Sequence, residues 1–218
     1  MRSLINISKI FVFVLLVFTT FVNQKLYSQI LIGPKAGLSF GVLSISDQVS
    51  SATNSYRIGF LVGGVVEFRI NDMFSIQAEP AYNQKGSDIS FNPDGYQVET
   101  KNRFGYLQMP LTFKVRLELL PFTPYVTIGP NVGFLLSAKT ESNFISPTPV
   151  EYDEMSNYKK TDFAIDLGAG CEYRMSASLI YTADIRYSLG IYDIHNVPDG
   201  GSVKTRGIQI LLGLLTTL

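Results

Sequence analysis

Eight separate segments of this chain alternate with period two, and one of the two alternating faces is apolar in every segment. In residues 32–42, Leu38 and Phe40 fall on the apolar face. Lys35 and Ser39 fall on the opposite face. This alternation is typical of a β-strand whose two faces meet different surroundings. The eight segments are residues 32–42, 56–68, 74–85, 106–116, 125–137, 162–173, 178–189 and 207–214.

The distribution of charge indicates where each face points. A water-soluble barrel encloses its apolar face and exposes its charged face. Here the apolar face carries no charge in any segment, and an Arg or Lys facing lipid at mid-bilayer costs about 2–4 kcal/mol. We therefore expect the apolar face to meet lipid and the charged face to line the lumen. The expected lumen charges are Lys35, Arg57, Arg69, Lys85, Lys114, Arg116, Arg186, Glu67, Glu79, Asp162, Asp166, Glu172 and Asp184.

The connections between the segments alternate between long and short, starting and ending with a long one. Residues 86–101 form one polar connection, and residues 139–161 form the longest. Transmembrane barrels have an even number of strands, short periplasmic turns and longer outer loops. The sequence thus predicts an all-β, eight-stranded antiparallel up-and-down transmembrane β-barrel over residues 29–218. We expect it in the outer membrane of the cell, with both termini in the periplasm.

The beginning of the chain has the features of a signal peptide. Arg2 and Lys9 precede an apolar run over residues 10–22, which is shorter than the roughly 20 residues of a spanning helix. We predict a signal peptide over residues 1–28 with cleavage after Ser28, the alternative being an uncleaved anchor. Beyond it no stretch approaches 18 apolar residues, so a membrane-embedded mature chain must be a closed barrel.

Composition excludes several classes of function. The formal net charge is zero, which leaves no basic surface to attract nucleic acid. Cys171 is the sole cysteine, so the chain has no internal disulfide. We predict neither a cofactor nor a metal site, because a single His with scattered carboxylates is a poor ligand set.

The expected lumen is narrow and charged. Eight strands enclose an interior just wide enough for side chains to fill. Opposite charges in such an interior should pair, because an unpaired buried charge is costly. We predict a closed, charge-paired lumen; the alternative is a narrow transport or ligand-binding barrel. The predicted network comprises Arg57, Glu67, Glu79, Lys114, Arg116, Asp166, Glu172, Asp184 and Arg186.

His195 is the one residue that offers a catalytic alternative. It lies in a predicted outer loop beside Asp193, with Ser188 and Ser202 near it in sequence. An Asp–His pair at the rim is compatible with a lipid-modifying enzyme or a protease. A solvated loop histidine explains it more simply, so we expect no enzyme and no catalytic residue.

Six motifs together resemble the PorT-like outer-membrane β-barrel family of Bacteroidota. The resemblance implies a small eight-stranded barrel, and it faintly implies a link to protein secretion and gliding machinery. The chain ends in Leu218, whereas barrels of this kind usually end in an aromatic residue. The motifs are GPKAGLSFG (33–41), FSIQAEPAYNQKG (74–86), YLQMPLTFK (106–114), PYVTIGPNVGFLLS (124–137), IDLGAGCEY (165–173) and DIRYSLG (184–190).

These observations predict a non-enzymatic outer-membrane barrel that serves as a structural or interaction component. Its expected partners are outer-membrane lipid and other envelope proteins, which would bind through the outer loops. We further expect Phe134 and Ile165 to face lipid and Ser137 to face the lumen.

Overall fold

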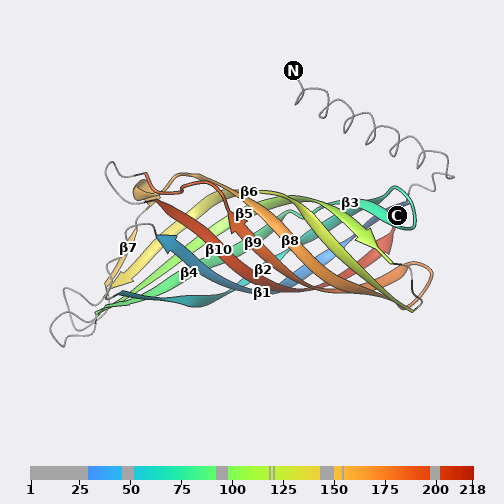
Figure 1. Ribbon diagram of the computed structural model, residues 1–218, viewed down its shortest axis with the longest axis horizontal. Coiled ribbons are helices and arrows are strands. Elements are labelled where there is room, and N and C mark those ends of the chain that lie inside the picture. Colours follow the sequence, from blue (N-terminus) through green and yellow to red (C-terminus); the bar gives the residue numbers. More distant parts are fainter. Residues whose placement is uncertain are drawn as a thin grey trace, which may run out of the picture.

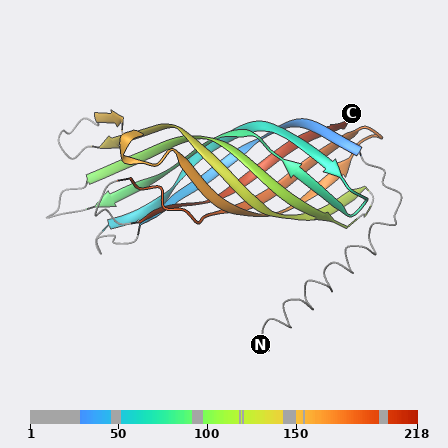
Figure 2. The same cartoon turned by 90° about the horizontal axis from the view of Figure 1, so that it is seen from above.

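The computed structural model describes residues 29–45, 52–91, 98–117, 119, 121–142, 150–153, 155–196 and 202–218. The predicted signal peptide lies outside these residues. The described strands wind around one axis as a tilted, elongated barrel (Figure 1; Figure 2). No helix among the described residues is long and apolar enough to cross a membrane.

The strands form one continuous antiparallel sheet. A short 3-10 helix, η2 (Met155–Asn157), lies in the connection between β7 and β8. The strands are β1 (Gln29–Ile45), β2 (Ala52–Arg69), β3 (Phe74–Ala78), β4 (Ala81–Phe91), β5 (Val98–Arg116), β6 (Phe122–Ser142), β7 (Val150–Asp153), β8 (Thr161–Arg174), β9 (Leu179–Gly190) and β10 (Val203–Thr217).

These strands occupy eight positions in a closed ring. β3 and β4 share one position, since both pair with β2 on one side and with β5 on the other. They are separated at Pro80, which has no backbone N–H to donate to a ladder. β7 pairs with the C-terminal end of β6, residues 139–142. The pairing of β1 with β10 closes the ring. The predicted eight-stranded antiparallel barrel is confirmed.

The strands extend further at one end of the barrel than the sequence predicted. β4 continues to Phe91 and β5 starts at Val98, so the predicted polar connection 86–101 is mostly strand. β6 and β7 also form a hairpin inside the predicted connection 139–161. Backbone pairing continues there without an apolar face, because these residues lie beyond the segments that need to match lipid. We call this end, where β1, β4, β6 and β9 end and β2, β5, β8 and β10 begin, the loop end.

The opposite end carries the connections 70–73, 117–121 and 175–178, and we call it the turn end. The first and last described strands both reach it. Gln29 pairs with Arg69 beside the first of these turns. The backbone N–H of Leu218 donates to the carbonyl oxygen of Ile30 at 3.0 Å, and the C-terminus lies at this end (Figure 1).

The two faces of the strands are arranged as predicted. Leu38, Phe134 and Ile165 lie on the outer surface with 40% or more of their area exposed. Lys35 and Asn131 point inward and are buried. Aromatic pairs lie on the outer face near the turn end, such as Phe122 with Tyr173 (ring centroids 5.1 Å apart). The apolar outer surface is that of a barrel surrounded by lipid.

The prediction that Ser137 faces the lumen is wrong. The β5–β6 register shifts just after Gly105, which makes Leu136 an extra residue in β6. Ala138 is therefore the next buried residue after this bulge. A Cβ at Gly105 would lie 2.6 Å from Ser137 Oγ and 2.7 Å from the hydroxyl of Tyr82, so Ser137 shares the outer side with Tyr82.

Candidate functional site

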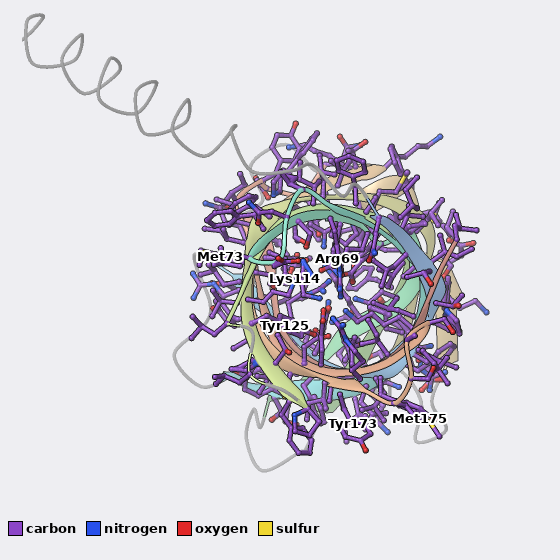
Figure 3. All side chains as sticks on the ribbon, turned by 90° about the vertical axis from the view of Figure 1, so that its right-hand side faces the viewer. Arg69, Met73, Lys114, Tyr125, Tyr173 and Met175 are labelled. Carbon is purple, nitrogen blue, oxygen red and sulfur yellow. The ribbon has the colours of Figure 1, made fainter. Side chains whose placement is uncertain are left out.

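Charged side chains fill the lumen near the turn end. The Glu67 carboxylate lies 3.1 Å from Arg69 Nε, 3.0 Å from Lys114 Nζ and 3.1 Å from Arg116 Nη2. Glu172 contacts Lys114 and receives Arg69 Nη2 at 2.9 Å. All five side chains are buried, and Arg69 and Lys114 point into the ring in Figure 3. This turn-end cluster holds three cations and two carboxylates.

The alternation of the strands places these groups together. Glu67 and Arg69 are two residues apart on β2, as are Lys114 and Arg116 on β5, so each pair shares the inner face. β3 lies between the two strands and supplies neutral hydrogen bonds. Its Gln77 amide donates to Glu67 at 2.8 Å, and Ser75 accepts from Arg116 at 2.7 Å.

A second group, the mid-barrel cluster, lies further along the lumen. It comprises Lys35, Glu79, Asp166, Asp184 and Arg186, all buried. Arg186 Nη2 lies 2.8 Å from Glu79, and Arg186 also approaches Asp184 at 3.7 Å and Asp166 at 3.9 Å. Lys35 Nζ lies 2.8 Å from Asp184 and 3.3 Å from Glu79. Two cations here meet three carboxylates.

Tyr125 of β6 connects the two clusters. Its ring lies under the Lys114 ammonium, 4.0 Å from nitrogen to centroid, and its hydroxyl donates to Asp184 at 3.0 Å. Figure 3 shows Tyr125 inside the ring. The excess positive charge of the turn-end cluster is thus next to the excess negative charge of the mid-barrel cluster, and each offsets the other.

A third charged group of the lumen, a single ion pair, lies toward the loop end. Lys85 Nζ is 3.6 Å from Asp162, and Thr205 donates its hydroxyl to the same carboxylate at 2.7 Å. The Lys85 ammonium also lies 5.4 Å from the centroid of the Tyr106 ring. With this pair, the buried cations and carboxylates of the three groups are equal in number.

Arg57 is the one predicted network residue that the structure places elsewhere. Its Nη1 lies 2.6 Å from Asp88, and both side chains are partly exposed. The other predicted residues lie in the turn-end and mid-barrel clusters. Lys35, Arg69, Lys85 and Asp162 were expected to face inward but were not included in the predicted network. Their partners depend on the register between distant strands, which the sequence pattern does not reveal.

The lumen also contains apolar layers that the sequence analysis missed. Along each strand these apolar residues occupy the same alternate positions as the inward charged residues. That alternation was the sequence signal that could have found them. One layer lies at the turn end: Leu31, Val65, Ile180 and Leu215. Another consists of Leu61, Ala81 and Leu211.

An apolar plug closes over the lumen at the loop end. Ile194, from the β9–β10 connection, is fully buried, and Tyr158, from the β6–β8 connection, packs against the same cluster. The rings of Phe104 and Tyr158 meet edge to face at 4.8 Å. The loop-end plug consists of Leu43, Phe104, Tyr106, Leu135, Ala138, Ile194 and Val203, with Met155 and Tyr158 packed against them.

Backbone hydrogen bonds join the two connections that form the plug. The Lys159 N–H donates to the Ile194 carbonyl oxygen at 2.7 Å, and Tyr158 and His195 form a β-bridge. The Asp193 carboxylate accepts the N–H groups of His195 at 3.0 Å and Val203 at 2.8 Å. Desolvation raises the pKa of Asp193. The two N–H donors and the nearby Lys159 together lower it by a larger amount, so its pKa lies below the usual 3.8.

The Asp193 carboxylate next to His195 therefore has a structural role. Its carboxylate holds the backbone of the plug loop, and Ser188 is buried in the lumen on β9. Among the described residues, no group of three or more His, Cys, Asp or Glu side chains is placed to hold a metal ion.

Comparisons with known proteins agree with the fold. Residues 23–196 match the family described as "Outer membrane protein beta-barrel domain". The outer membrane protein OprG of Pseudomonas aeruginosa is similar in structure, with a TM-score of 0.51 and 11% identity over 88% of this chain and 97% of that chain. Neisserial surface protein A is also similar, with a TM-score of 0.49 and 14% identity over 86% and 97% of the two chains. No curated protein matches the chain by sequence.

Proposed function

The chain belongs to the outer membrane protein beta-barrel domain family, and from this premise we propose that it is a non-enzymatic barrel with a closed lumen. In this proposal it serves as a structural or interaction component of the outer membrane. The lumen charges hold the walls together, and the outer loops meet other envelope proteins.

One ion pair carries the proposal of a closed lumen. Arg69 Nη2 and Glu172 Oε2 are 2.9 Å apart, although β2 and β8 are four positions apart in either direction around the ring. The pair therefore joins opposite walls of the barrel. Its side chains and those of Lys114 occupy the space that a conducting path would need.

The loop-end plug supports the same conclusion from the other end. Ile194 and Phe104 are almost completely buried, so the plug is packed as a protein core is. A solute entering from this end would have to displace the joined loop segments before it reached the mid-barrel cluster.

Single-channel recording in planar bilayers tests the closed lumen. We expect the refolded barrel to insert without a steady open current, whereas a known porin in the same bilayer conducts. A steady open current from the wild-type barrel would refute the closed lumen and favour the alternative, a narrow transport barrel.

On the sequence motifs alone, we propose that the chain belongs to the narrower PorT-like family. We also propose that both termini lie in the periplasm. On this view the barrel is an accessory subunit of a secretion-associated assembly. Purification from native membranes in mild detergent, followed by mass spectrometry, should recover an envelope protein complex. Recovery of the barrel alone would contradict an accessory role.

A further inference from the structure

A layer of the lumen between the mid-barrel cluster and the loop-end plug contains buried oxygen atoms that no donor of the described residues reaches. These atoms are the amide oxygens of Asn83, Asn131 and Gln209 and the Oδ1 atom of Asp162. Each of the four side chains is at most 2% exposed. A buried acceptor without a donor is costly, and most buried polar atoms in folded proteins are bonded to protein or to ordered water. We call these four residues the polar layer.

The position of the polar layer follows from its neighbours. The Asn131 amide donates to Asp166 of the mid-barrel cluster at 2.9 Å. Asn83 pairs with Tyr106 of the loop-end plug. The four residues of the layer lie on β4, β6, β8 and β10, so they approach the lumen from different sides of the ring. The layer therefore separates the charged middle of the barrel from the apolar plug.

The contacts of the two asparagines direct their amide oxygens away from protein donors. Asn131 Nδ2 donates to the Asp166 carboxylate, and a reversed amide would place its oxygen against that negative charge. Asn83 Nδ2 donates to Gln108 Oε1 at 2.8 Å. Both amide nitrogens are thus occupied by protein acceptors, and both oxygens are left for another donor.

Asp162 is bonded on one side only. Its Oδ2 atom accepts the Thr205 hydroxyl at 2.7 Å, and the Lys85 ammonium lies 3.6 Å from the same oxygen. The Oδ1 atom has no partner among the described residues. The hydroxyl of Tyr106, on the strand next to Lys85, has none either. The layer therefore presents more acceptors than neutral donors.

The charge balance of the lumen indicates that a guest in this layer is uncharged. The buried cations and carboxylates of the three charged groups are equal in number. A charged guest would add an unpaired charge to a buried environment, which is costly. A hydroxyl group donates and accepts hydrogen bonds without carrying a charge. It matches a layer that needs donors for its oxygens and an acceptor for the Tyr106 hydroxyl.

We propose that the polar layer binds uncharged, hydroxyl-bearing molecules that donate to the four unpartnered oxygens. Water and a small polyol such as glycerol share this chemistry, and a buried water makes about three hydrogen bonds to polar groups around it. This inference goes beyond the proposed function. Its tests measure stability and proton contacts and not current, so a dry polar layer and a conducting lumen are separate results.

The sign of one substitution tests for a guest. Gln209→Met keeps the approximate size of the side chain but removes its amide. If Gln209 Oε1 accepts from a bound hydroxyl, the variant loses that bond, and the folding equilibrium constant in liposomes should fall about two- to ten-fold. If the oxygen has no donor, the substitution removes a desolvation cost, and the constant should rise several-fold. A rise or an unchanged constant would overturn the proposal.

Gln77→Met is the matched control for urea unfolding. The Gln77 amide donates to Glu67 at 2.8 Å in the turn-end cluster, so its bond is made within the protein. Its loss should lower the folding equilibrium constant whether or not the polar layer holds a guest. The control gives the size of the effect that one lost buried hydrogen bond has in the same barrel.

Nuclear Overhauser spectra of the wild-type barrel in detergent micelles identify the guest. We expect the side-chain amide protons of Asn131 and Gln209 to show contacts with water protons. Contacts with the carbon-bound protons of added glycerol would identify a polyol instead. Contacts with neither molecule would overturn the proposal, and this result does not depend on the folding of Gln209→Met.

Discussion

Arg186 and Glu79 meet in the middle of the barrel from opposite walls, with Arg186 Nη2 2.9 Å and 2.8 Å from the two carboxylate oxygens. Glu79 lies between β3 and β4, and Arg186 lies on β9, four positions away around the ring. Lys35 contacts the same carboxylate. Each member of this group depends on the others for its stability in a buried environment.

Replacing Glu79 with alanine should destabilise the barrel strongly. The change leaves Arg186 and Lys35 with less buried negative charge, and breaking a buried ion pair from one side costs about 3–5 kcal/mol. Urea unfolding of the refolded protein in liposomes measures the effect. Asp88→Asn is the control, because its pair with Arg57 is partly exposed and should cost about 0–1 kcal/mol. Equal losses in the two variants would refute the central role of Glu79.

The ring and its two faces could be predicted because lipid imposes them on every strand. Phe134 and Lys35 each follow a rule of period two that needs no knowledge of distant residues. The partner of Arg186 could not be predicted, because it depends on the stagger between opposite strands. Ile194 could not be assigned to a plug for a related reason: the loops carry no period, and their packing is decided only in three dimensions.

Gly33 should tolerate no side chain at the seam that closes the barrel. A Cβ at this position would overlap the backbone carbonyl oxygen of Leu214 on β10. Gly33→Ala should therefore destabilise the barrel by about 1–3 kcal/mol, as overpacking does elsewhere. Gly64→Ala is the matched control, since the nearest atom to its Cβ would lie 3.6 Å away. Heat-modifiable migration and urea unfolding would show the difference, and similar behaviour of the two variants would contradict the clash.

An arginine should be harmful at Ile165 and mild at Ser137. Ile165 faces outward within an apolar column, where an Arg at mid-bilayer depth costs about 2–4 kcal/mol. Ser137 also faces outward because of the β5–β6 bulge, but it is two residues from Lys139, where the strand carries charged residues near the loop end. An Arg there can reach the headgroups, at a cost of about 0–1 kcal/mol. Unfolding free energies in liposomes test this, and an equal cost at both positions would contradict the assigned depths.

Asp193 should hold the loop-end plug in a pH-dependent way. Its carboxylate accepts the N–H groups of Val203 and His195, and its pKa is lowered in the folded state. A lowered folded pKa means that the stabilisation is complete above the unfolded pKa and is lost as the pH falls through the folded value. Asp193→Asn keeps an acceptor oxygen but removes its charge, and a neutral hydrogen bond is about half as strong as a charge-assisted one. Hydrogen exchange at these two amides should therefore speed up at neutral pH by roughly two- to ten-fold, which corresponds to a loss of about 0.5–1.5 kcal/mol.

The wild-type protein should approach the variant only below pH 3.8, where the carboxylate becomes protonated. Amides in the middle of β9, such as that of Ile185, are the internal control. They lie in a ladder with β8 and β10, remote from Asp193, and should exchange slowly in both proteins. A uniform increase over the whole barrel would mean that Asp193 stabilises the fold globally. Unchanged exchange at Val203 and His195 would show that the plug loop is held by its apolar contacts alone.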